Sequence, residues 1–159
     1  MKPLPKSLGL LWAGMIFGCG VALAQAPEAM DPIEKRKEIV DAANWKGMET
    51  VTVELKEHSY NPESLVFKAG QPYKLIMRNS GEKKHYFTAP EFFKAIATRK
   101  VQSDKDGEIK APYFLAIEMM PNGGQLDLYF VPVTKGKYPL YCTESDHRQQ
   151  GMEGTVVIE

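Results

Sequence analysis

A short segment near the C-terminus carries three side chains that could bind one soft metal ion. Cys142, His147 and Met152 follow one another with four residues between each pair of candidate donors. Runs typical of β-strands flank them at 138–141 and 155–158, and a loop held at both ends can turn its side chains towards one point. Sulfur donors select copper, and two histidines with a cysteine and a weak axial methionine form the electron-transfer copper arrangement. The segment lacks only a second histidine.

The remaining histidines of the chain are His58 and His85. His58 ends a strand-like run, whereas His85 follows another run and the turn Asn79-Ser80-Gly81. Nothing in the local sequence decides which of the two reaches the loop. In a sandwich of antiparallel strands, the end of one strand and the loop before the last strand can meet at the same pole.

The pattern Cys142-x4-His147-x4-Met152, with His85 upstream after the Asn79 turn, resembles the cupredoxin family of type 1 copper proteins. The loop spacing is similar to that of rusticyanin, and is one residue longer between histidine and methionine than that of azurin. The run from His85 to Phe93 further resembles periplasmic cupredoxins linked to copper tolerance or to terminal oxidases. The resemblance covers roughly residues 49–159.

This resemblance implies a ligand set and a role for each ligand. It makes His85 the first ligand, because the family places that histidine after an asparagine-containing turn, and leaves His58 as a surface residue. Cys142 would bind one copper ion as a thiolate, His85 and His147 would complete a trigonal plane, and Met152 would tune the potential axially. Family precedent also implies that His147 reaches the surface as the electron exit.

Two departures from the family pattern bear on the site. Many members have asparagine or serine after the first histidine, which bonds the two ligand loops together, but this chain has Tyr86 there. Around His147 the chain carries Glu144, Asp146 and Arg148 in place of small apolar residues. We therefore expect a charged rim and a salt-sensitive contact with partners.

The N-terminus has the pattern of a secretory signal peptide. Lys2 and Lys6 precede an apolar run, which ends in Ala22-Leu23-Ala24. This predicts a signal peptide over 1–24 and a periplasmic protein; a segment left uncleaved would instead be a membrane anchor. Cleavage would leave Cys142 as the one cysteine, which excludes an internal disulfide. The alternatives for this thiol are a metal ligand and a small buried hydrophobe.

Length and charge limit the classes of protein. The 159 residues suit one domain, and the 20 basic residues balance the 20 acidic ones, so nothing favours nucleic acid as a partner. Residues 25–48 are predicted to form a tail with a short helix over Pro32–Ala43, opened by an Asp-Pro-x-Glu signature. Residues 49–159 are predicted to form the cupredoxin domain.

Alternating apolar residues and turn signals predict an all-β fold after residue 49. Val51, Val53 and Leu55 alternate with polar residues, as do Leu126 and Leu128. We expect a Greek-key β-sandwich of the cupredoxin type, with the short N-terminal helix and a short helical insert within 91–97. Residues 87–110 are otherwise the least regular part.

Two functions fit the predicted site. The first is a monomeric electron shuttle, not an enzyme, between redox partners such as a cytochrome or a terminal oxidase. The second is a copper-tolerance protein that binds copper or passes it to copper-handling proteins. Zinc is disfavoured because a thioether is a poor zinc ligand, and three histidines are too few for a multicopper oxidase. A cysteine enzyme would need an oxyanion site that the sequence does not reveal.

Overall fold

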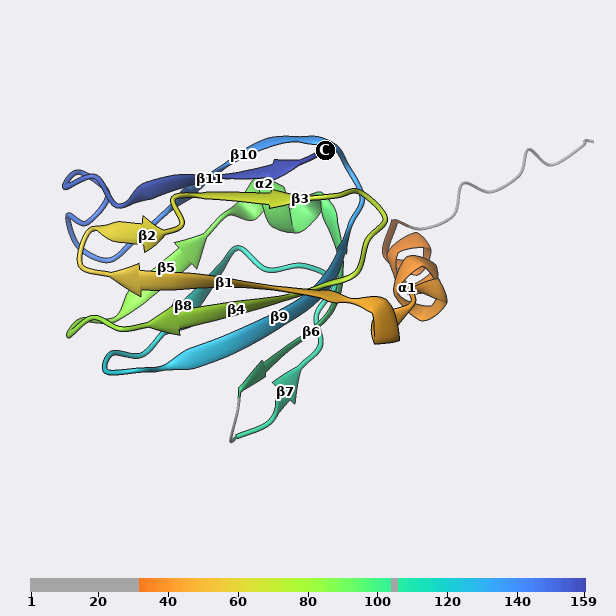
Figure 1. Cartoon of the computed structure of the whole chain (residues 1–159), viewed down its shortest axis with the longest axis horizontal. Helices are drawn as coiled ribbons and strands as arrows, with labels where there is room; N and C mark the ends of the chain where they lie inside the picture. The colour runs from red at the N-terminus through yellow and green to blue at the C-terminus, as the bar shows by residue number, and fades with distance from the viewer. Residues whose placement is uncertain (1–31, 104–105) are drawn as a thin grey trace, which may run out of the picture.

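The computed structural model describes residues 32–103 and 106–159, so the predicted signal peptide lies outside the described residues. These residues form two packed sheets, with one helix at an end of the sandwich (Figure 1). The helices are α1 (Pro32–Ala42), a 3₁₀ turn (Trp45–Gly47) and α2 (Pro90–Lys94). The strands are β1 (Glu49–Lys56), β2 (Ser59–Asn61), β3 (Ser64–Phe67), β4 (Tyr73–Asn79), β5 (His85–Thr88), β6 (Ile96–Ser103), β7 (Glu108–Ile109), β8 (Ala116–Met119), β9 (Gln125–Pro132), β10 (Gly136–Tyr141) and β11 (Glu153–Ile158).

One sheet has the strand order β2-β1-β4-β9-β6-β7, and the other β3-β11-β10-β5-β8. Most pairs are antiparallel, as expected, but β1 pairs with β4 and β3 pairs with β11 in parallel. The predicted β-sandwich is confirmed. Its second sheet carries both β5, which begins at His85, and β10, which ends one residue before Cys142.

Aromatic side chains fill the space between the sheets. Phe92 is fully buried, and its ring centroid lies 5.5 Å from that of Phe130 and 6.1 Å from that of Phe67. Phe87 of β5 joins the same group through Phe92. Buried aromatic rings contribute large apolar areas to a core. The strand that carries His85 is therefore anchored two residues further on, at Phe87.

The two α-helices match the sequence predictions, but several strands were missed, of which β6 is the longest. No residue of α1 is buried, in line with a surface helix, and α2 is the predicted insert with Phe92 and Phe93 buried. The strand β6 lies in the stretch predicted to be irregular, and a register shift between Thr98 and Lys100 breaks its alternation. No helix among residues 32–103 and 106–159 is long and apolar enough to cross a bilayer.

Candidate metal centre

The candidate site lies where β5 and β10 meet. The two strands are antiparallel and share the register pair Tyr141 with Thr88. Cys142 follows directly after this pair, and His85 lies at the start of β5. The seam therefore brings together two donors that are 57 positions apart in the chain.

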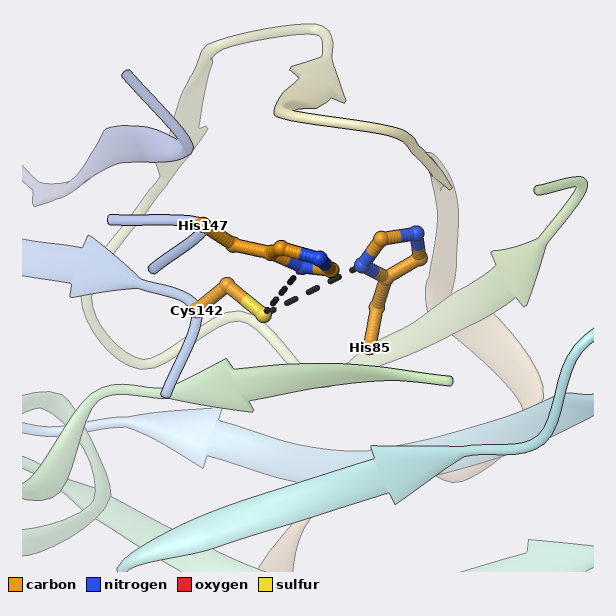
Figure 2. Close-up of side chains that lie close together, drawn as sticks. All are labelled: His85, Cys142 and His147. Atoms are coloured by element: carbon orange, nitrogen blue, oxygen red, sulfur yellow. Dashed lines mark hydrogen bonds between the residues drawn. The ribbon is translucent and has the colours of Figure 1, made fainter. Parts of the chain in front are cut away.

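Three of the predicted ligands form one buried group. The Sγ atom of Cys142 lies 3.7 Å from Nδ1 of His147 and 3.9 Å from Nδ1 of His85 (Figure 2). The candidate ligand atoms of these residues all lie within 4.8 Å of one another. The side chains of His85, Cys142 and His147 are 0%, 1% and 1% exposed. The structure thus brings together two imidazoles and a thiol away from water.

The separations between these donors fit a single ion. The bond lengths of a zinc ion of similar size, about 2.0–2.1 Å to nitrogen and about 2.3 Å to sulfur, would put donors at trigonal angles roughly 3.8 Å apart. The observed nitrogen–sulfur distances of 3.7 and 3.9 Å match this. A thiol with two imidazoles is also a donor set that copper favours. The residues present therefore fit a copper ion.

Backbone amides surround the sulfur atom of Cys142. The amide N–H of Tyr86 donates to Sγ at 3.4 Å, and that of Glu144 donates at 3.5 Å. Among the described residues, Cys142 is a free cysteine. The two amides therefore fix the position of the sulfur next to the histidines. The form of cysteine that binds metals is the thiolate.

In both histidines the Nδ1 atom faces the sulfur of Cys142, and the Nε2 atom points away from it. These Nε2 atoms are buried and have no hydrogen-bond partner among the described residues. Burial, followed by the charge of His147, lowers the pKa of His85 below its ordinary value. A lowered pKa favours the neutral imidazole, which is the form required of a metal ligand. Glu57 Oε1 lies 4.0 Å from Nε2 of His85.

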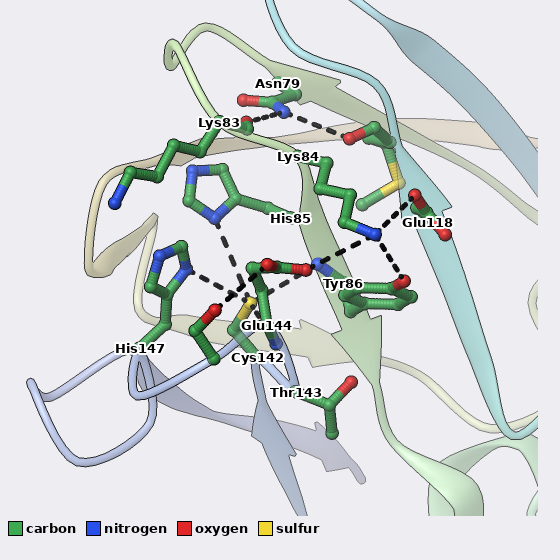
Figure 3. Close-up of polar contacts among 12 residues, drawn as sticks. Asn79, Lys83, Lys84, His85, Tyr86, Glu118, Cys142, Thr143, Glu144 and His147 are labelled. Atoms are coloured by element: carbon green, nitrogen blue, oxygen red, sulfur yellow. Dashed lines mark hydrogen bonds and ion pairs between the residues drawn. The ribbon is translucent and has the colours of Figure 1, made fainter.

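Asn79 shapes the turn that delivers His85. Its buried side-chain amide donates to the carbonyl oxygens of Lys83 at 2.7 Å and Met119 at 3.0 Å (Figure 3). Its side-chain oxygen accepts the amide N–H of Gly81 at 2.9 Å. Asn79 thus ties the β4–β5 loop to β8, and this accounts for the asparagine-containing turn before His85.

Met152, the fourth predicted ligand, is fully buried within the same loop. Its amide N–H donates to the carbonyl of His147 at 2.9 Å, and its carbonyl accepts the amide N–H of Cys142 at 3.1 Å. The backbone of Met152 therefore closes the loop next to the other donors. Its role as an axial ligand stays a prediction.

Two expectations drawn from the family pattern change with the structure. His147 is buried, so the prediction that it reaches the surface is wrong. His58 is not a simple surface residue either: it is half-buried, and its ring centroid lies 5.0 Å from that of His147. Local spacing could not reveal this contact, because the β1–β2 turn is far from residue 147 in sequence.

The bond between ligand loops that Tyr86 cannot make is replaced elsewhere. The hydroxyl of Thr88 lies 3.1 Å from that of Thr143, the residue after Cys142. Tyr86 contributes through its backbone instead, since its N–H bonds to Cys142 Sγ and its carbonyl accepts the Tyr60 hydroxyl at 2.6 Å. The side chains of Thr88 and Thr143 thus provide a hydrogen bond between the two ligand-bearing segments, in place of the one that Tyr86 cannot make.

The surface around the centre is charged, and its charges are paired locally. Arg148 is exposed, donates to Glu153 at 2.6 Å and stacks over the Tyr141 ring. Lys84 lies 3.5 Å from a carboxylate oxygen of Glu144 and 3.6 Å from one of Glu118. Among the described residues around the centre, charged side chains thus form part of the rim, as the sequence predicted.

The fold and the site together define a β-sandwich with a buried His–Cys–His group at one pole. The model of the cupredoxin-like domain family matches residues 39–158, and the chain belongs to this family. A search of curated proteins finds no match.

Solved structures similar to this chain include two proteins whose names refer to copper. A multicopper oxidase from Pseudomonas thermotolerans is 17% identical with a TM-score of 0.56, over 74% of this chain and 31% of its own. A copper nitrite reductase from Nitrosomonas europaea is 10% identical with a TM-score of 0.54, over 69% and 48%. An auracyanin from Roseiflexus castenholzii is 19% identical with a TM-score of 0.49, over 71% and 99%. The chain thus spans less than half of the oxidase and the reductase.

Proposed function

We propose that the protein binds one copper ion through His85, Cys142 and His147, with Met152 as axial ligand, and transfers single electrons between redox partners. The observation that carries this proposal is the buried group of two imidazoles and one thiol, with nitrogen–sulfur distances that suit a single ion. Bound copper would supply a couple between Cu(II) and Cu(I).

The chain's own residues would keep the site in one geometry during this change. His85 is fixed by the Asn79 turn, and Cys142 by the Tyr86 and Glu144 amides. His147 and Met152 are held through the backbone bonds that close their loop. A ligand set that is held on rigid strands and supported by hydrogen bonds changes little between oxidation states. Such rigidity supports electron transfer in preference to substrate turnover.

The cellular setting is part of the proposal. The predicted signal peptide supports export to the periplasm, where the protein would act as a monomer. Its partners would be redox proteins such as a cytochrome or a terminal oxidase. The charged rim supports a polar contact with them, because complementary charges mainly raise association rates.

A role in copper tolerance, in which the protein binds or passes on periplasmic copper, uses the same ligands. The burial of all three donors favours an ion that stays in place, because handing it on requires the loop to open. We therefore rank electron transfer first. Growth of a deletion strain in raised copper, compared with its respiratory rate at ordinary copper, separates the two roles.

Metal analysis tests the site itself. Protein refolded with equal copper and zinc should bind one copper per chain and show an intense visible band from cysteine-to-copper charge transfer. Cys142→Ala should lose the copper and the band, and Val133→Ala serves as a control, because Val133 is an exposed residue outside the ligand set. Stoichiometric zinc in the wild-type protein, without colour, would contradict the proposal.

A further inference from the structure

The outer side of the candidate metal centre is covered by the β1–β2 turn, Glu57-His58. The ring of His58 stands edge-on to that of His147, with centroids 5.0 Å apart and planes at 75°. His147 is 1% exposed, whereas His58 is half-buried. Among the three histidines of the chain, His58 therefore meets the solvent, and it lies against a ligand that does not.

The backbone of His58 is in an uncommon conformation. Its φ angle is +58°, in the left-handed region that favours glycine and asparagine. Residues held in this region tend to occur at functional sites. Glycine would satisfy this backbone position but would leave His147 without its aromatic neighbour. The ring is thus what His58 adds to the turn.

The turn is fixed to the loop that delivers His85. Oε1 of Glu57 accepts the amide N–H of Glu82 at 2.5 Å and that of Lys83 at 3.4 Å. The same oxygen lies 4.0 Å from Nε2 of His85. Glu57 is anchored in this way, and His58 is the next residue in the chain. The backbone of His58 is therefore also fixed next to the metal centre.

We infer that His58, and not the ligand His147, is the point at which a redox protein contacts the metal centre. The inference rests on the proposed function. Electron tunnelling weakens steeply with distance, so a partner must approach where the covering layer is thinnest. The His58 ring offers direct contact with His147 on one side and solvent on the other. One electron leaves the reduced site through these two rings, and the oxidised partner gains it.

A charge placed at His58 tests this path with a small anionic oxidant, ferricyanide. Aspartate tolerates the left-handed backbone, so His58→Asp adds a negative charge without a change of turn. The matched control is Val133→Asp. Val133 is exposed and precedes β10, whereas Cys142 follows the end of that strand. Stopped-flow mixing of the reduced proteins with ferricyanide, which becomes ferrocyanide, gives the rates.

We expect His58→Asp to slow this oxidation roughly tenfold at low salt, because the added carboxylate repels the anion at close range. The effect should shrink at high salt as the charges are screened. Val133→Asp should react within about twofold of the wild-type protein. Equal rates for the two aspartate variants would overturn the inference.

The absorption spectrum separates the other outcomes. His58→Asn should keep the charge-transfer band and the copper content, because His58 is assigned no bond to the metal. Loss of the band in this variant would make His58 a ligand and would also overturn the inference. A wild-type protein that binds no copper would refute the proposed function first, and with it the role of His58.

Discussion

The hydroxyl of Thr88 lies 3.1 Å from the hydroxyl of Thr143, across the seam between the strand of His85 and the segment after Cys142. Thr88 is nearly buried, whereas Thr143 is exposed. The contact adds a side-chain bond where β5 and β10 share the register pair Tyr141 with Thr88.

Thr88→Val and Thr143→Val should each destabilise the metal-free protein by about 1 kcal/mol, because a hydrogen bond between neutral groups contributes about that much. The double variant should lose less than the sum of the two, since the shared bond is lost only once. Urea unfolding of the four forms measures this coupling. Strictly additive losses would mean that the hydroxyls do not interact.

Copper should stabilise the folded protein, and this stabilisation should require the ligand residues. Binding to the folded state alone adds about 4 kcal/mol when the free ion is a thousandfold above its dissociation constant. His85→Ala and Cys142→Ala should lose most of the rise in melting temperature, and His58→Asn should retain it. Calorimetry with and without copper shows this. A similar rise in all four forms would indicate binding elsewhere.

The ion pair between Lys74 and Asp127 should give a pH-dependent contribution to stability. Lys74 Nζ lies 2.7 Å from Asp127 Oδ2, and this hydrogen bond chiefly raises the pKa of Lys74 above its ordinary value of 10.5. A raised pKa means that the contribution is complete below pH 10.5 and is lost as the pH climbs through the folded-state value.

Lys74→Met should therefore cost about 2 kcal/mol at neutral pH, because it leaves the Asp127 carboxylate in a nearly buried position without its cation. The difference from the wild-type protein should narrow above pH 10.5. Lys74→Arg keeps a charge at every such pH and is the control. Denaturant unfolding at several pH values measures the difference in unfolding free energy between Lys74→Met and the wild-type protein. A difference that stays constant with pH would exclude the ion pair as its source.

Phe92 should be among the most costly core residues to truncate. It is fully buried, and its ring lies within 5.5–6.4 Å of the rings of Phe67, Phe87, Phe93, Phe130 and Tyr138. Phe92→Ala should destabilise the protein by about 3–5 kcal/mol, whereas Phe92→Leu should cost less because it leaves a smaller cavity. Equal losses in urea unfolding would show that ring volume is not what matters there.

Features of the fold and the site that depend on local chemistry and on periodicity could be predicted from the sequence. Val53 and Leu55 alternate with exposed residues in β1, and the spacing of Cys142 and His147 places both in one loop. The strand β6 escaped prediction because its irregular register disrupts the pattern of apolar residues that marks a strand.

The contact between His58 and His147 also lay beyond local patterns. It depends on how the β1–β2 turn of one sheet meets the β10–β11 loop of the other. Such a contact is set by the packing of the sheets, and no spacing in the chain records it. The burial of His147 follows from the same packing, and this is why family precedent gave the wrong exposure.

The seam between β5 and β10 also sets the order in which the donors can assemble. Cys142 and His147 are 5 positions apart and can meet while the chain is still largely unstructured, but His85 is 57 positions from Cys142. Contacts of such long sequence separation form slowly, because the entropy of closing a large loop must be overcome first. The third donor therefore arrives only when β5 docks beside β10. Before that step, the chain offers a metal ion two donors at most from this group. Tight binding of the ion by all three donors therefore reports that folding is complete.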